Sequence, residues 1–388
     1  MKKLPGLAAL TSMLLYGLHF FWGGGHARLL TDSEAYLLMA QGSHHLGAPY
    51  TSRVFGPLVA SIIASVFGVS VLAAFQVLTP AVLLASLLLL RSLIRRHGGS
   101  IKWQAAILLA LGCGLAATFG YTPVMVDPLM LFLTCLTITA LDRAYFAVAV
   151  VLATLAALTK EYALVLGLVT LLVAYRRGHR GLAFIGVLLP TIAFLVTNLL
   201  TTPGSSGSSM SSWQGFVSAM FGYQAHVFRF RGASEYPKLL YMWSWSTLWP
   251  VIAIGAALTF SKLRSRIRMR DEEVAFLLML LAMPLLLLGD WGRALLILVP
   301  FACIVATAHP LAREGYFAFF LAVGGLATAL ARPFHSEPPP PRFLPLALTV
   351  ISVVSSLLIG IRIYRLVRKS TLHLDPDVRR PSPQIAVP

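Results

Sequence analysis

Long apolar runs recur from one end of this chain to the other, and they limit its fold more than any other feature. They lie roughly at 5–22, 57–90, 103–121, 124–141, 144–159, 162–175, 181–200, 247–261, 274–289, 294–309, 315–331 and 343–361. Most approach the ~20 residues that a helix needs to cross a hydrocarbon core about 30 Å thick. Only 12% of the residues are charged, whereas soluble domains carry about 25%. The sequence therefore predicts an all-α polytopic integral membrane protein with about 12 transmembrane helices, in a range of about 10 to 13.

The polar stretches between these runs define the expected domain organisation. A single transmembrane domain is predicted over 1–362, with a long first outer loop at 23–56 and a second long outer loop at 201–246. The remaining segment, 363–388, is predicted to be a disordered cytoplasmic tail. Because GGGHARLL is a poor cleavage site after the first apolar run, we interpret that run as a retained span and not as a signal peptide.

Two apolar regions do not fit a simple crossing. The run at 57–90 is too long for one span at about 1.5 Å per residue, and Gly68 and Pro80 are the places where it could bend. We therefore expect a surface-lying helix that leads into a true span at 70–90. Segments 144–159 and 162–175 are short, so they form either two short spans or a re-entrant pair.

Basic residues set the expected orientation. They cluster at 2–3, 91–102, 143, 176–180, 262–270, 313 and 362–380, and these clusters alternate with loops poorer in Lys and Arg. The positive-inside rule then places both termini in the cytoplasm and the protein in the plasma (inner) membrane as a multi-pass protein. These clusters hold 22 of the 31 basic residues and most of the net charge of +17, which predicts contact with anionic membrane lipids and not with nucleic acid. The three cysteines lie in apolar runs without metal-ligand spacing, so the sequence indicates no disulfide or zinc site.

The same orientation gathers ionisable residues on the outer side. They are Asp32, Glu34, Arg53, Asp127, Lys160, Glu161, Asp290 and Arg293, and they come from four different loops. Counted along their helices, several lie about 22 to 26 Å above the cytoplasmic boundary, within a core about 30 Å thick. Charges at such depth are costly and usually functional, so we expect them to face a cavity below the outer surface.

Three of these residues also have purely structural interpretations. Glu34 completes a capping box with Thr31, which would satisfy an amide at the start of a helix. Arg53 begins an apolar run and could reach lipid head groups as an interfacial anchor. Asp127 precedes Pro128, a natural first helical residue, so Asp127 could serve as an N-cap.

The remaining charges could pair within short segments. Lys160 and Glu161 could form an internal ion pair, and Asp290 could pair with Arg293 across one helical turn. His44 and His45 fit ordinary loop residues better than metal ligands. The aromatic residues of 213–249 fit an interfacial belt, with sugar or lipid stacking as the alternative.

Taken together, these features resemble the type C (GT-C) glycosyltransferases, polytopic enzymes that use polyprenyl-phosphate-linked sugars. The matching segments are TDSEAY at 31–36, YTSRVFGP at 50–57, VDP at 126–128, TKE at 159–161 and GDWGR at 289–293. The likeness covers about residues 1–310 and depends on the order and common sidedness of the motifs.

The resemblance implies a transfer chemistry. Asp32 would be the catalytic base, with Glu34 beside it, and would deprotonate an acceptor that attacks the anomeric carbon with inversion. A lipid phosphate leaves, so positive charge must be in place. The donor-phosphate candidates are Arg53, Lys160 and Arg293, and the substrate-binding candidates are Tyr36, Tyr50, Asp127, Glu161 and Asp290.

The expected partners follow from that chemistry. They are a polyprenyl-phosphate-linked sugar donor, a glycan or lipid acceptor, and membrane lipids, with the active site facing the periplasm or outside and the protein a monomer. No cofactor is required, although so many carboxylates could bind a divalent ion such as Mg or Mn.

A transporter or flippase of an anionic lipid-linked sugar is the alternative function, because intramembrane charges also suit proton relays. Transporters usually place such charges near the midplane and contain two related halves. Here the charges gather on one face and no internal repeat is visible, which favours the enzyme.

Overall fold

The computed structural model describes residues 3–22, 31–43, 50, 53–201, 249–264, 267–286, 291–331 and separate helical residues between 350 and 365. This part of the chain is all-helical and contains no strand. The helices are α1 (Leu4–Trp22), α2 (Thr31–Ala40), α3 (Phe55–Phe67), α4 (Val71–Arg96), α5 (Ile101–Tyr121), α6 (Asp127–Asp142), α7 (Phe146–Thr159), α8 (Leu164–Arg176), α9 (Arg180–Thr201), α12 (Trp249–Arg264), α13 (Asp271–Leu286), α14 (Trp291–Ala306) and α15 (Gly315–Ala331), with 3-10 helices η2 (Glu161–Ala163) and η3 (Pro310–Arg313).

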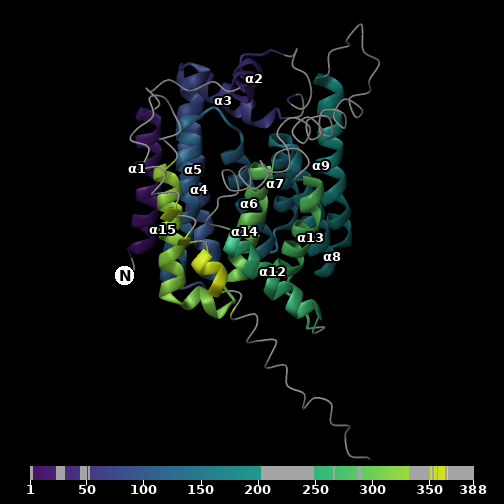
Figure 1. Ribbon diagram of the computed structural model, residues 1–388. Helices are drawn as coiled ribbons and strands as arrows, with labels where there is room; N and C mark the ends of the chain where they lie inside the picture. The colour runs from purple at the N-terminus through teal and green to yellow at the C-terminus, as the bar shows by residue number, and fades with distance from the viewer. Residues whose placement is uncertain are drawn as a thin grey trace, which may run out of the picture.

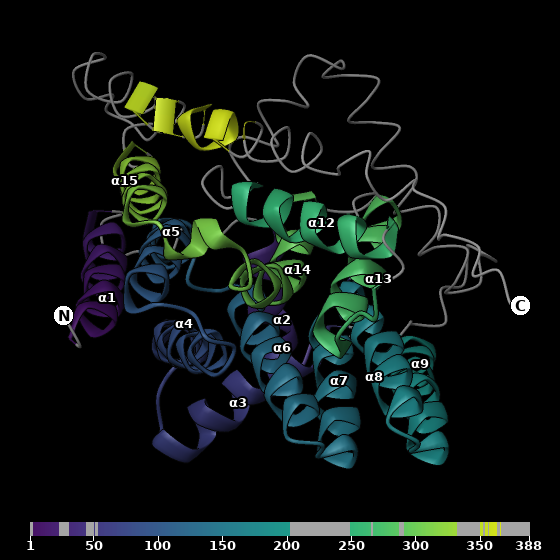
Figure 2. The same cartoon turned by 90° about the horizontal axis from the view of Figure 1, so that it is seen from below.

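Most of these helices run side by side along one axis (Figure 1). Seen along that axis, α1, α5 and α15 form one group, α6 to α9 form a row, and α4 and α14 lie between them (Figure 2). In the spanning segment of α5, 94% of the residues are buried, whereas only 22% are buried in that of α9. The exposed face of α9 is apolar and includes Phe184, Leu188 and Ile192. An apolar exterior around a packed interior is what a lipid environment requires.

Among the described residues, four helices are long and apolar enough to cross a membrane, as expected of an all-α membrane protein. Their spanning segments are Leu4–Phe21, Val71–Arg96, Ile101–Gly120 and Arg180–Thr197. Other apolar helices, such as α3 and α7, have only 13 and 14 residues. The larger expected number of spans therefore stays a prediction, because helices of this length reach about 20 Å against a core of about 30 Å.

The long apolar run at 57–90 breaks at Gly68, as the sequence predicted. Gly68 ends α3 with a left-handed backbone (φ 64°), and its amide donates to the Ala64 carbonyl. A new helix then begins with Ser70, whose side chain accepts from the Ala73 amide. Glycine adopts this conformation without strain, which explains a stop here. Pro80, the other predicted bend, lies inside α4, and the helix continues through it.

The molecule has two chemically different ends. At one end, which we call the basic end, the segments after α4, α6, α8 and α14 meet. The linking hydrogen bonds run from Thr307 Oγ1 to the His97 carbonyl, from Ser100 Oγ to the Ala312 carbonyl and from Arg177 Nη1 to the Leu141 carbonyl. At the opposite end, which we call the α2 end, lie α2, α3 and the α7–α8 turn (Figure 1). This alternation of ends agrees with the predicted order of loops, while their sides of the membrane stay a prediction.

Candidate functional site

The α2 end contains a buried arginine–glutamate pair. Arg53 lies two residues before α3, and Glu161 opens η2 after α7. Arg53 Nε donates to Glu161 Oε2 at 2.8 Å, and Nη2 donates to Oε1 at 2.5 Å. The third nitrogen, Nη1, donates to Tyr36 Oη at 2.9 Å. With side chains only 6% and 2% exposed, this is a bidentate pair with little access to solvent, a geometry that favours arginine over lysine.

A second ion pair lies beside the first. Lys160 Nζ donates to Asp127 Oδ1 at 2.7 Å, and both side chains are fully buried. The ammonium also lies 5.3 Å from the centre of the Tyr162 ring. Two opposite charges can be buried together in this way, whereas one alone would carry a large desolvation cost.

The backbone of Lys160 explains why two neighbouring residues have different partners. Lys160 is extended (φ −160°, ψ 134°) and ends α7, and Glu161 then starts a new 3-10 turn. Their side chains therefore leave the chain in different directions. The structural alternative of a Lys160–Glu161 ion pair is not what forms, because each residue pairs instead with a distant segment.

Asp32 is connected to the Arg53–Glu161 pair through tyrosines. Tyr50 Oη donates to Asp32 Oδ1 at 2.6 Å. The Tyr36 and Tyr50 rings meet edge-on with centroids 6.0 Å apart, and the Arg53 guanidinium lies 5.6 Å from the Tyr50 ring. Asp32 and Tyr36 are four residues apart on α2 and therefore share one helix face. Unlike the buried charges behind it, Asp32 is half-exposed.

The structural alternatives for two residues are corrected by this geometry. Arg53 is not a lipid-facing anchor, because the whole residue is only 5% exposed and its guanidinium is bound by protein groups. Asp127 does not act as the N-cap, because α6 begins at Asp127 itself and Val126 occupies the cap position. The Asp127 carboxylate binds Lys160 instead.

Seven of the ten predicted site residues therefore lie together at the α2 end: Asp32, Tyr36, Tyr50, Arg53, Asp127, Lys160 and Glu161. Glu34 is not part of this group, since it is exposed and makes no hydrogen bond or ion pair with any described residue. Arg293 lies in the first turn of α14, but its side chain, like Asp290, His44, His45 and 213–248, is outside the described residues.

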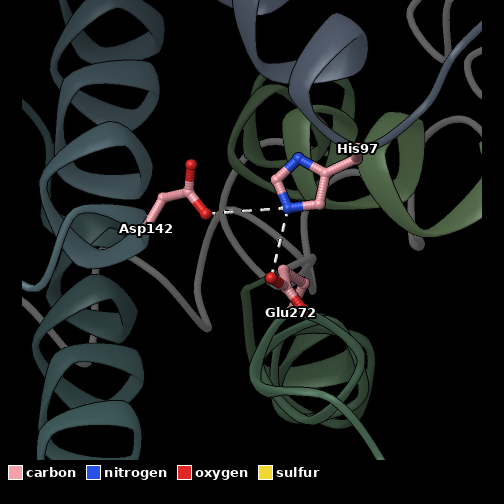
Figure 3. Close-up of side chains that lie close together, drawn as sticks. All are labelled: His97, Asp142 and Glu272. Carbon is pink, nitrogen blue, oxygen red and sulfur yellow. Dashed lines mark hydrogen bonds and ion pairs between the residues drawn. The ribbon is translucent and has the colours of Figure 1, made fainter.

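A second cluster, which the sequence did not predict, lies at the basic end, where His97, Asp142 and Glu272 converge (Figure 3). His97 Nε2 lies 3.1 Å from Glu272 Oε1 and 3.8 Å from Asp142 Oδ1. The hydrogen bond with Glu272 raises the pKa of His97, and the same bond lowers the pKa of Glu272 to about 2. The residues are 45 to 175 positions apart and sit among arginines that we interpreted only as topology signals.

Arg53 binds Glu161 and Lys160 binds Asp127, while the Asp32 carboxylate accepts a hydrogen bond from Tyr50. A half-exposed carboxylate held by a tyrosine and backed by fixed charges is suited to accept a proton from a substrate. No protein-family model, curated protein or solved structure matches this chain. The interpretation of the site therefore depends on its own geometry.

Proposed function

We propose that this protein is a membrane glycosyltransferase that moves a sugar from a polyprenyl-phosphate-linked donor to a glycan or lipid acceptor. The observation that carries the proposal is the connection from half-exposed Asp32 through Tyr50 to the buried Arg53–Glu161 pair. Groups from separate loops meet there, as expected for an active site between helices.

In this proposal Asp32 is the general base. Its carboxylate takes the proton of an acceptor hydroxyl, and the acceptor oxygen forms a bond to the anomeric carbon. The bond from that carbon to the phosphate oxygen breaks, and polyprenyl phosphate leaves with the electron pair and with inversion at the anomeric carbon. Tyr50 holds Asp32 by a 2.6 Å hydrogen bond, which limits the movement of the base and keeps it oriented.

Arg53 and Lys160 support this chemistry mainly by position. Each already binds a carboxylate at 2.8 Å or less, so a donor phosphate would have to share the cation with Glu161 or Asp127. The pairs fix the entrance to α3, the start of α6 and the α7–α8 turn around Asp32. Arg293 in the first turn of α14 stays a candidate for the phosphate itself.

The decisive experiment measures release of polyprenyl phosphate from a panel of polyprenyl-phosphate sugars by purified protein in nanodiscs. We expect turnover by wild type and a loss of about 10²-fold or more in Asp32→Asn, the usual range for removing a general base. Glu34→Gln, two residues away and exposed, is the matched control and should keep at least half of the wild-type rate.

Two outcomes contradict the proposal. Wild-type turnover by Asp32→Asn removes Asp32 from the role of base. Translocation of labelled lipid-linked sugar across the bilayer without release of polyprenyl phosphate establishes the flippase alternative instead.

A further inference from the structure

Helix α13 opens with three consecutive carboxylates, 271–273, which have different partners. The outer two are neutralised by cations: Asp271 lies 3.1 Å from Arg176 and 2.7 Å from Arg177, and Glu273 lies 2.5 Å from Lys262 and 3.1 Å from Arg270. The middle one, Glu272, faces the imidazole of His97. Its second oxygen, Oε2, is buried and has no hydrogen-bond partner among the described residues. A buried carboxylate oxygen without a hydrogen-bond partner is rare, and a bound water or ion is a common explanation for one.

The orientation of His97 matches that of a metal-binding histidine. Its Nδ1 lies 2.9 Å from the Leu93 carbonyl, which can only accept, so Nδ1 carries the proton. Metal-binding histidines are commonly fixed in this manner, with the other nitrogen directed at the ion. Here the other nitrogen, Nε2, points between Asp142 and Glu272 (Figure 3).

The spacing of the three side chains suits a small ion. Their ligand atoms all lie within 4.8 Å of one another. Bonds of 2.0 to 2.1 Å in a tetrahedron separate neighbouring ligand atoms by about 3.3 Å, close to the 3.1 and 3.8 Å between Nε2 and the carboxylate oxygens. Asp142 presents Oδ1 to this point while its Oδ2 lies 3.5 Å from Arg96. The contact with Arg96 helps to orient the Asp142 carboxylate, with Oδ1 directed at His97.

A small cavity adjoins the cluster. It measures about 20 Å³ and is lined by His97, Asp142 and Glu272, by the Arg177–Asp271 ion pair, and by apolar residues of α6, α8, α13 and α14. A space of about 10 to 15 Å³ is enough for one water. There is therefore room for a water ligand beside the three side chains.

We propose that His97, Asp142 and Glu272 bind a divalent transition-metal ion such as Zn²⁺ at the basic end, with water completing the coordination. One nitrogen and two carboxylate oxygens suit such ions better than Ca²⁺ or Mg²⁺, which prefer oxygen alone. The two carboxylates balance the charge of the ion. Because the ligands come from the ends of α4, α6 and α13, the ion would join three helices. This site is independent of the proposed transfer chemistry.

A protonated His97 between two carboxylates is the competing explanation. A proton on Nε2 satisfies Glu272 Oε1 but leaves Oε2 without a partner among the described residues, whereas a water bound to the ion would supply one. The two explanations also differ in what they predict for added metal. Only a metal site gives saturable binding and stabilisation that depend on all three side chains.

The test uses full-length protein in nanodiscs, purified with a tag that lacks histidine and stripped with chelator. Zn²⁺ is measured by equilibrium dialysis with elemental analysis, and Co²⁺ by its visible absorption. We expect one ion per chain, a rise in the unfolding midpoint with Zn²⁺, and an affinity at least tenfold weaker in His97→Gln and Glu272→Gln. The control His179→Gln should bind as wild type, since that ring packs on Phe146 and not on these carboxylates.

Either of two results overturns the proposal: no saturable binding by wild type, or wild-type affinity in His97→Gln. If His97→Gln and Glu272→Gln fail to fold, Asp142→Asn decides, because it keeps the shape of the side chain and removes only its charge. Weaker Zn²⁺ binding in Asp142→Asn supports the site, and unchanged binding rejects it.

Discussion

The two charged clusters of this protein differ in how completely their charges are matched. At the α2 end, the four charged side chains of the two ion pairs are 0 to 6% exposed, and each has a partner of opposite charge. At the basic end, His97, Asp142 and Glu272 are 9 to 24% exposed, and one imidazole serves two carboxylates. One carboxylate oxygen there has no partner among the described residues.

This difference separates structural charges from charges that can bind a ligand. A ligand can bind to one member of a buried ion pair only if that member separates from its partner. Leaving the partner charge buried and unpaired has a large free-energy cost. A partly exposed carboxylate that has one oxygen without a hydrogen-bond partner can bind a ligand without giving up an existing interaction. We therefore expect substitutions at the α2 end to change stability strongly, and those at the basic end to act mainly through added metal.

The largest expected effect is that of Lys160→Met. It leaves Asp127 buried without its cation, and such changes cost about 3 to 5 kcal/mol. The free energy of unfolding, measured by denaturant titration in detergent, checks this value. The double variant Lys160→Met/Asp127→Leu removes both charges and should recover most of the loss. Equal losses in the single and double variants would show that packing, and not the unpaired charge, is responsible.

A smaller loss is expected for Arg53→Lys, which keeps the charge but removes the two-pronged contact with Glu161 and the hydrogen bond to Tyr36. Losing hydrogen bonds to charged groups costs about 1.5 to 3 kcal/mol each, and lysine restores part of that, so we expect a net loss of about 2 kcal/mol. The same unfolding titration measures it. A lysine variant as stable as wild type would mean that charge alone holds the cluster.

The apolar pattern predicted much of the fold. Helix positions, the alternation of ends and the stop at Gly68 follow from apolar run length and glycine geometry, which act locally. The same alternation predicted that Asp32, Arg53 and Lys160 come to one end. The number of spans could not be predicted as well, since short apolar helices such as α3 have the composition but not the length of a crossing.

The pairing within the clusters could not be predicted. Lys160 and Glu161 are adjacent in the sequence, yet the extended backbone at Lys160 sends them to different partners. The basic-end cluster was missed because His97, Asp142 and Glu272 are each isolated in the sequence. Their meeting depends on the lateral packing of α4, α6 and α13, about which hydropathy carries no information.

Tyr36→Phe tests the edge of the α2-end cluster. It removes only the hydroxyl that accepts from Arg53 Nη1 and leaves the bidentate contact with Glu161 in place. One buried donor then lacks a partner, so we expect a loss of about 1 kcal/mol. Combined with Arg53→Lys, the losses should fall short of additive, since both changes remove the same hydrogen bond. If the two losses in the free energy of unfolding were strictly additive, Tyr36 would stabilise the protein through packing and not through its hydrogen bond with Arg53.

The smallest expected effect is that of Glu272→Gln in excess chelator. Its contact with His97 is partly exposed, and such pairs contribute at most about 1 kcal/mol.

Glu273→Gln is the matched control on the same turn, because Glu273 is 2% exposed and accepts from both Lys262 and the Arg270 amide. Its loss should be about 2 kcal/mol or more by the same titration. Added Zn²⁺ should then raise the unfolding midpoint of Glu273→Gln but not that of Glu272→Gln. The opposite result would be that, in chelator without added Zn²⁺, Glu272→Gln is less stable than Glu273→Gln. Glu272 would then be a structural charge like those of the two buried ion pairs, and the contrast between the two ends would fail.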